Sequence, residues 1–499
     1  MLLVISRGWG LLLLLPLLFC TYAEGVHRSL FFDTYPKPID HPEQQWLWQK
    51  LDHFNLTDSR FWRQRFLIND EFYRRGGPVF LELGGEQSAV HTRVTTTSLL
   101  SYGKRIGALC VFLEHRYYGK SFPTRNISTE NLRFLSSRQA LEDAVHFRKF
   151  LISKLGLFRN KWIVFGGSYA GSLAAWLKVK HPEMFHSAVA YSAPIYAKAN
   201  FSEYLEVVQK ALFRHGNSEC VNAVRNASQV LMYMLKYEKY HRNISRDFRL
   251  CEKVILDSEE KISYFLETLK SRISFLVQYN KERPLNQNQM NHNFGQITTV
   301  DITLDYFCQV MTTKSLGTPY ERYAYFFIKN LKAYQFPCWN SSYENFLAFM
   351  RHSEWNREAA KGARQWLYQT CTEFGFFQTT DSKHQPFLGV PMSFYIDKCN
   401  KIFDLKFDIN SVLESVKNTN KYYFKPLIKT GQRILFLNGD LDPWNALSIN
   451  ARMPRNLVGM TIKNSSHCEV MFKNPFSDPQ NLKKARHFIF KTLLSWLSE

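Results

Sequence analysis

The chain has 499 residues, of which 45% are hydrophobic and 15% aromatic, and its formal net charge is +21. This length and apolar content suffice for a large core, divided into about two to three domain-sized units. Lysine and arginine are spread along the chain without a basic run or a nucleic-acid-binding module, so the charge does not indicate a nucleic-acid partner. We expect a basic, soluble globular protein.

Residues 1–23 have the organisation of a secretory signal peptide. Arg7 gives a positive start, an apolar stretch follows over 11–19, and Tyr22-Ala23 offers a small-residue cleavage site. The apolar stretch is shorter than the ~20 residues that a membrane-spanning helix needs. We therefore expect a cleaved signal, no integral membrane segment, and a mature protein that is secreted or resides in a lysosome or endosome.

Cysteines and sequons agree with an oxidising, glycosylating route. The cysteines beyond the signal are widely spaced and include no Cys-x-x-Cys pair, so the sequence predicts disulfides rather than a zinc site. Spacing alone does not decide how they pair. Asn-x-Ser/Thr sequons predict N-glycans at Asn55, Asn126, Asn200, Asn226, Asn243 and Asn340.

Short apolar runs alternate with helical patterns in the first part of the mature chain. Strands are predicted at 78–83, 108–113 and 187–192, and apolar residues at helical spacing predict a helix over 138–155. This alternation is typical of a mainly parallel sheet with helices on both faces, so an α/β fold is expected.

The most informative run covers residues 162–176. Four apolar or aromatic residues lead into Gly166-Gly-Ser-Tyr-Ala-Gly171, and an Ala/Leu-rich segment follows. This predicts a buried strand, a tight turn and a helix, with Ser168 at the apex, a geometry that exposes a serine as a nucleophile. Ala170 departs from the pattern Gly-x-Ser-x-Gly, although a small residue still suits close packing of strand and helix. Taken alone, the motif fits a loop serine equally well.

From Phe201 to about Phe387 the chain is rich in helical patterns, sequons and cysteines, which predicts a mostly helical inserted domain. Strand patterns return at 433–437 and 458–462, and 482–497 predicts a closing amphipathic helix. The mature chain is thus divided into a first core part at 24–200, a helical cap at 201–387 and a second core part at 388–499.

A candidate acid and base follow the two late strands. Asp440 and Asp442 come after the first of them, and His467 comes after the second. The order Ser168, acid, histidine is that of α/β-hydrolases, in which the histidine is the general base and the acid orients it. The aspartates could instead be turn formers. Spacing does not choose between Asp440 and Asp442.

An oxyanion hole would need two backbone donors near Ser168. The N–H of Tyr169, the residue after the serine, is the expected first donor. The second is expected in the loop after an early strand, where Gly85 is the candidate. Glycines in that loop could also serve only a tight turn.

Further landmarks lie between about residues 46 and 497. They are Gln49-Lys-Leu-Asp-His-Phe54, Glu114-His-Arg-Tyr-Tyr-Gly-Lys-Ser121, Arg133-Phe-Leu-Ser-Ser137, Gln139-Ala-Leu-Glu-Asp143, Gly166-Gly-Ser-Tyr-Ala-Gly171, Tyr368-Gln-Thr-Cys-Thr-Glu373 and Asn438-Gly-Asp-Leu-Asp-Pro-Trp444. With them the chain resembles the serine peptidase family that comprises lysosomal Pro-Xaa carboxypeptidase, dipeptidyl peptidase II and thymus-specific serine protease. It is most similar to the thymus-specific branch.

The resemblance implies an α/β-hydrolase core with a helical insertion that shapes a restricted, exopeptidase-like cleft. It implies Ser168, Asp442 and His467 as the triad, and so it chooses Asp442 over Asp440. Cutting after proline is the preference of the other members, and an aromatic and apolar pocket near Trp444 would favour it. Family cysteine positions imply the disulfides Cys220–Cys308, Cys251–Cys338 and Cys371–Cys399, with Cys110 and Cys468 unassigned.

The sequence thus predicts a serine peptidase that cleaves peptide substrates through an acyl-enzyme on Ser168, without a metal or cofactor, and it allows a homodimer. A glycan on Asn464 would crowd the cleft, so that sequon is expected to stay unmodified. Two alternatives remain, a lipase or esterase with the same triad and a binding protein that has lost catalysis. The absence of a triad member would mark the second, and none is absent.

Overall fold

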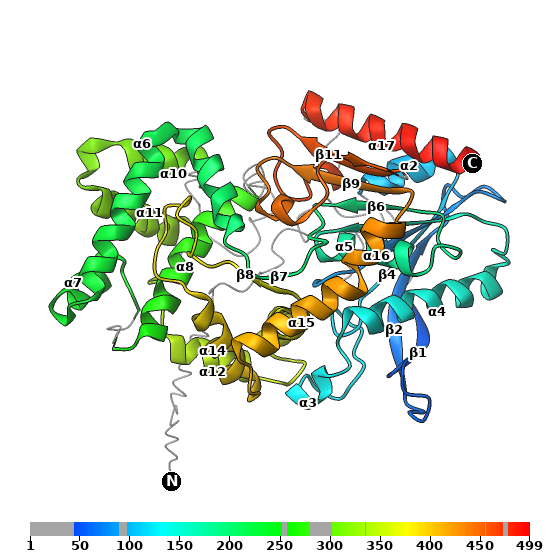
Figure 1. Ribbon diagram of the computed structural model, residues 1–499, viewed down its shortest axis with the longest axis horizontal. Helices are drawn as coiled ribbons and strands as arrows, with labels where there is room; N and C mark the ends of the chain where they lie inside the picture. The colour runs from blue at the N-terminus through cyan, green and yellow to red at the C-terminus, as the bar shows by residue number, and fades with distance from the viewer. Residues whose placement is uncertain are drawn as a thin grey trace, which may run out of the picture.

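The computed structural model describes residues 44–88, 97–251, 257–279, 302–334, 336–454, 456–472 and 478–499, so the predicted signal peptide lies outside them. Within these ranges the core is a nine-stranded sheet (Figure 1). The strand order is β1-β2-β4-β3-β5-β6-β9-β11-β10. The bounds are β1 Gln44–Lys50, β2 Phe61–Asn69, β3 Val79–Leu83, β4 Leu109–Leu113, β5 Trp162–Gly167, β6 Ser187–Tyr191, β9 Ile434–Gly439, β10 Arg452–Met453 and β11 Leu457–Ile462.

The centre of the sheet is parallel and its edges are antiparallel. Every neighbouring pair from β4 to β11 in the strand order runs parallel. At one edge β1 and β2 form a hairpin that joins β4 in antiparallel fashion, and at the other edge β10 is antiparallel to β11. The carboxyl ends of β5, β9 and β11 therefore meet at one side of the sheet, where the candidate triad follows them.

Helices cover both faces of the sheet, as the strands of parallel sheets require. In β5, Ile163 and Phe165 pack on the face covered by α2 and α17, whereas Trp162 and Val164 pack on the face of α4, α5 and α16. Figure 1 shows α17 on one side of the sheet and α4 and α16 on the other. The bounds are α2 Ser98–Ile106, α4 Ser137–Leu155, α5 Tyr169–Lys180, α16 Phe424–Thr430 and α17 Gln480–Ser498.

This is the α/β-hydrolase arrangement, with a mostly parallel sheet, helices on both faces and a helix that begins directly after the strand carrying the serine. The fold class that the sequence predicts is confirmed. The strand patterns at 78–83, 108–113, 187–192, 433–437 and 458–462 correspond to β3, β4, β6, β9 and β11.

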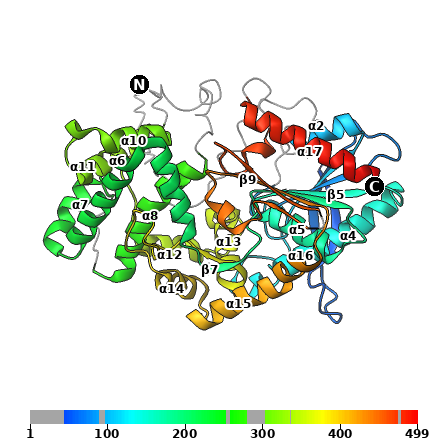
Figure 2. The ribbon, with the colours of Figure 1, turned by 45° about the horizontal axis from the view of Figure 1, so that its top comes forward.

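A helical region lies beside this core and is joined to it by a short ribbon (Figure 2). Strand β7 (Lys198–Asn200) pairs in parallel with β8 (Gly375–Phe377), which brings the two ends of the region together. Helix α6 also packs on the single turn η5 (Pro443–Leu447) after β9. Among the residues that the structure describes, the α-helices between β7 and β8 are α6 Glu203–Leu235, α7 His241–Asp247, α8 Glu259–Gln278, α10 Leu304–Thr312, α11 Pro319–Ala333, α12 Tyr343–Arg351 and α13 Ala363–Gln369.

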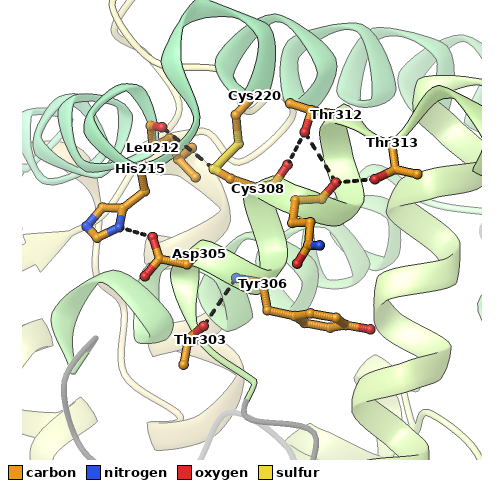
Figure 3. Close-up of a disulfide and its surroundings, with 10 residues drawn as sticks. Leu212, His215, Cys220, Thr303, Asp305, Tyr306, Cys308, Thr312 and Thr313 are labelled. Carbon is orange, nitrogen blue, oxygen red and sulfur yellow. Dashed lines mark hydrogen bonds and ion pairs between the residues drawn. A yellow bond between two sulfur atoms is a disulfide. The ribbon is translucent and has the colours of Figure 1, made fainter.

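Three disulfides stabilise the helical region and its exit. Their pairs are Cys220–Cys308, Cys251–Cys338 and Cys371–Cys399, the pairs that the resemblance implies, and Cys110 and Cys468 are free and buried. Figure 3 shows the first of them, which joins α6 to α10. Helix α6 is kinked at Gly216, where a Cβ would overlap both cysteines, so glycine permits this close approach.

A buried ion pair connects the loop after β4 to α4. Arg116 is fully buried, and its Nε and Nη2 donate to Asp143 at 2.6 and 2.7 Å. His53, after β1, contacts the same carboxylate at 2.7 Å. Burial alone would raise the pKa of Asp143, but the Arg116 guanidinium lowers it. The pair therefore stabilises the fold at neutral pH, and this contribution is lost as the pH falls through the lowered pKa.

Replacing Asp143 with alanine is expected to cost about 3–5 kcal/mol of unfolding free energy, because it leaves the buried Arg116 charge unpaired. Denaturant unfolding measures this loss. Glu414→Ala is a suitable control, since Glu414 pairs with Lys417 on the exposed surface. A loss for Asp143→Ala no larger than that of the control would contradict the prediction.

The predicted glycan sites differ in their surroundings. Asn55 and Asn226 are exposed, whereas the Asn200 amide donates to Asp381 at 2.8 Å. Glycosylation stays a prediction at all of these sites. Within the described ranges, no helix combines the length and apolar character needed to cross a membrane.

Candidate active site

Ser168 stands at the turn between β5 and α5. It is the N-cap of α5, with φ 57° and ψ −130°, a strained conformation for a residue other than glycine and the one expected where a serine is lifted above a sheet. Its backbone N–H donates to the Tyr191 carbonyl of β6 at 2.9 Å. Part of the residue remains exposed, so the turn presents Ser168 rather than burying it.

The same turn explains why the motif departs from Gly-x-Ser-x-Gly. A Cβ on Gly171 would lie 2.9 Å from the Tyr191 carbonyl oxygen and 3.0 Å from the Ala193 side chain. The Ala170 side chain instead faces Gly85, whose own Cβ would lie 3.3 Å from it. The close approach of helix and strand therefore falls at residue 171, and alanine fits at residue 170.

Asp442 and His467 form a buried pair after β9 and β11. His467 Nδ1 contacts Asp442 Oδ2 at 2.9 Å, and the two side chains are 3% and 0% exposed. Asp442 Oδ1 accepts the Trp444 N–H at 3.0 Å, which fixes the carboxylate. Asp440 points elsewhere, because its Oδ2 pairs with Arg214 of α6 at 2.7 Å. Of the two aspartates, Asp442 is therefore the one that contacts the histidine.

The loop that carries His467 lies against the serine turn. The Tyr191 carbonyl, which accepts the Ser168 N–H, also lies 3.9 Å from the Cys468 Sγ, and the Cys468 N–H donates to the Ser192 hydroxyl at 2.8 Å. The end of β6 thus connects the two loops. Ser168, Asp442 and His467 therefore all lie at the carboxyl ends of parallel strands of the sheet, and His467 contacts Asp442.

Residues 49–489 match the family model for the serine carboxypeptidases S28. The chain belongs to this family of serine peptidases. It is 33% identical to human thymus-specific serine protease, over 95% of this chain and 91% of that protein, and 27% identical to mouse lysosomal Pro-X carboxypeptidase, over 90% and 88%. A proline iminopeptidase structure from Mycobacterium smegmatis covers 87% of this chain and 95% of its own, at 11% identity and a TM-score of 0.36.

Membership of family S28 makes the protein a serine-type hydrolase of peptides, as the sequence predicts. The three disulfides are typical of a protein that matures in an oxidising compartment, and they agree with passage through the secretory pathway.

In this S28 peptidase, residues of the landmarks 114–121 and 368–373 contact the side chain of Tyr169, which directly follows the serine. Burial lowers the pKa of His115 to about 4, so its ring is neutral, and Nδ1 donates to the Arg116 carbonyl at 2.6 Å. Nε2 is then the acceptor for the Tyr169 hydroxyl at 3.1 Å. Gln369 donates to the same hydroxyl at 2.9 Å and accepts from Tyr118 at 2.7 Å. This network fixes Tyr169, and sequence reasoning gave its members no such role.

Trp444 lies in an aromatic cluster next to the acid. Its ring centroid is 5.3–5.6 Å from those of Phe201, Tyr204 and Phe376, all contributed by the start or end of the helical region. The residue is 8% exposed. The helical region therefore surrounds Trp444 with aromatic side chains, and a substrate pocket at this residue stays a prediction.

Sequence reasoning missed two residues of α8 and its end that reach the site. The Gln278 carbonyl accepts the His467 N–H at 2.9 Å, and the Tyr279 ring meets the His467 ring edge-on at 5.8 Å. Nothing in the local sequence marks either residue, since both are brought in by packing of the helical region.

The charge state of His467 predicts the pH dependence. Burial disfavours the imidazolium, but the Asp442 carboxylate outweighs it and raises the pKa of His467 well above its usual value. Only neutral His467 can accept a proton, so kcat/KM is expected to rise with pH through an apparent pKa above about 6.5. The stabilising effect of the pair has the opposite sign, because it is complete at low pH and is lost as the pH rises through that pKa. A pH–rate profile whose acid-side midpoint lies below about pH 6.5 would contradict the predicted pH dependence of kcat/KM.

Proposed function

We propose that this S28 peptidase cleaves peptides through an acyl-enzyme on Ser168, with His467 as general base and Asp442 as the orienting acid. The buried His467–Asp442 contact of 2.9 Å beside the strained serine turn is the observation that carries the proposal. With Nδ1 engaged by Asp442, the other ring nitrogen of His467 is left to act on the serine hydroxyl.

The steps follow from these roles. His467 takes the proton of Ser168 while Oγ attacks the scissile carbonyl carbon, and the tetrahedral intermediate carries the negative charge on oxygen. When it collapses, the C–N bond breaks and His467 gives the proton to the leaving amine. A water molecule then gives a proton to His467 and attacks the ester carbonyl carbon. As the bond from this carbon to Oγ breaks, His467 returns the proton to Oγ, which releases the acid product and restores Ser168.

The oxyanion is assigned to two backbone donors. Tyr169 N–H is the first N–H of α5, where the helix dipole also favours negative charge. The loop after β3 supplies the second, for which we propose Gly85, since that loop lies against Ala170 at the turn. The network under the Tyr169 ring supports this assignment by holding the donor in place.

For the substrate we propose an exopeptidase-like action with a preference for proline before the scissile bond. Trp444 is the proposed pocket residue, because an aromatic face can stack on a proline ring, and the helical region with its proposed limits at 201–387 would restrict the cleft. The similarity to mouse lysosomal Pro-X carboxypeptidase, whose name states cleavage after proline, supports this choice. We further propose a lysosomal, endosomal or secreted location.

A peptide library incubated with the purified, secreted protein and read by mass spectrometry tests the proposal. We expect the protein to cleave peptides near a terminus, at the bond that follows a proline. We also expect a fluorophosphonate to block this cleavage and to attach to Ser168. Hydrolysis of acyl esters without peptide cleavage would point to the esterase alternative. Binding without any turnover or labelling would point to a non-catalytic protein.

A further inference from the structure

The helical region reaches the catalytic loops through the last residue of α8. Gln278 is 6% exposed, and its backbone carbonyl accepts the His467 N–H at 2.9 Å. Its side-chain Oε1 accepts the Trp444 indole N–H at 3.1 Å and the Tyr204 hydroxyl at 2.7 Å. One residue of the helical region thus bonds both to the loop of the base and to the loop of the acid.

These contacts complete a closed ring of hydrogen bonds. Trp444 donates its indole N–H to Gln278 and its backbone N–H to Asp442 at 3.0 Å. Asp442 holds His467 Nδ1 at 2.9 Å, and His467 returns to the Gln278 carbonyl through its backbone N–H. The ring fixes both the backbone and the imidazole of His467, and Gln278 is the member that the core does not supply.

We propose that Gln278 is a positioning residue of the peptidase reaction, through which the helical region holds His467 and Asp442 in register with Ser168. This inference rests on the proposed function. A catalytic base must be held to within about 1 Å, since displacement by that distance costs about 10²-fold in rate. Removing the Gln278 amide oxygen is also expected to disturb the site, because it leaves two buried donors, the Trp444 indole N–H and the Tyr204 hydroxyl, without this acceptor.

The side chain of Gln278 lies close enough to the triad to affect its charge. Its Oε1 accepts from the indole of Trp444 at 3.1 Å, and the backbone N–H of the same residue donates to Asp442 at 3.0 Å, so a single residue separates the Gln278 side chain from the acid. A carboxylate at position 278 should therefore favour the charged form of His467.

The test compares Gln278→Leu, Gln278→Glu and Thr268→Val in the full secreted protein. Thr268 is a matched control on the same helix, because its buried hydroxyl oxygen also faces an indole donor, Trp339 Nε1 at 3.4 Å, but within the helical region. The probe is a fluorophosphonate, and the measurements are its saturating rate of attachment to Ser168 against pH, kcat and KM for a cleaved peptide, and the unfolding temperature.

We expect Gln278→Leu to lower the labelling rate and kcat by at least about 10-fold with KM changed less than about threefold, because it displaces the base rather than the substrate. Thr268→Val should lower the unfolding temperature and leave both rates unchanged. Gln278→Glu keeps the acceptor oxygens, so its rate should stay within about threefold of wild type at its optimum, and its acid midpoint should move to higher pH.

Each result decides the inference. Wild-type rates in folded Gln278→Leu, or equal rate losses in Gln278→Leu and Thr268→Val, would overturn it and leave the proposed function intact. If Gln278→Leu does not fold, Gln278→Glu decides, and an unchanged acid midpoint overturns the inference. No labelling of the wild-type protein would overturn the proposed nucleophile, and the inference with it.

Discussion

Replacing Ser168 with alanine is expected to lower kcat for peptide hydrolysis by about 10⁶-fold, the loss typical of removing the nucleophile of a serine peptidase. The reason is that His467 and Asp442 have no function in attack without the hydroxyl, so only substrate binding and the oxyanion donors remain. Attachment of a fluorophosphonate should be abolished in the same variant. The rate of peptide cleavage and labelling of the purified protein measure both effects.

The variant should fold, because the hydrogen bond that holds the turn comes from the backbone N–H of residue 168 to the Tyr191 carbonyl and survives the substitution. Ser187→Ala is the control, since Ser187 is a buried serine at the amino end of β6, far along the strand from the turn. It should retain wild-type activity. Peptide cleavage or labelling that persists in Ser168→Ala would assign the nucleophile to another residue.

Features encoded in short stretches of sequence could be predicted. The run into Ser168 carries its own signals, four apolar residues for a buried strand and small residues where β5 and α5 approach, so strand, turn and helix follow from local pattern. The late strands β9 and β11 are equally apolar and lead directly to Asp442 and His467. Parallel pairing then brings these ends together, which is why the order of the three residues was informative.

The edge hairpin was not predicted, because its strands are rich in polar side chains. Gln49 and Gln64 are both fully or almost fully buried, and they satisfy each other by a hydrogen bond of 2.6 Å across β1 and β2. Burial of such residues depends on partners that only the folded sheet provides. A prediction based on hydrophobic periodicity therefore does not identify these glutamines as buried strand residues.

Contacts between distant segments were also beyond the sequence. Gln278 and Tyr279 meet His467 only because α8 packs against the core at its last turn. The same cause left the choice of acid open, since Asp440 and Asp442 are equivalent by spacing. The resemblance favours Asp442, and the contacts in the fold distinguish the two, because Asp440 pairs with Arg214 of α6 whereas Asp442 contacts the histidine.

Asp442→Asn and Asp440→Asn are therefore expected to differ by orders of magnitude. An amide at 442 can donate to His467 Nδ1 and so favours the tautomer whose other nitrogen already carries a proton, which should lower kcat by about 10⁴-fold. Asp440→Asn loses a part-exposed ion pair with Arg214 and should change kcat less than about threefold. Steady-state kinetics on the two variants decide the matter, because a large loss in Asp440→Asn with activity retained in Asp442→Asn would reverse the assignment. The acid limb of the Asp442→Asn profile should also move to lower pH, since burial is then no longer outweighed by the carboxylate that raises the pKa of His467.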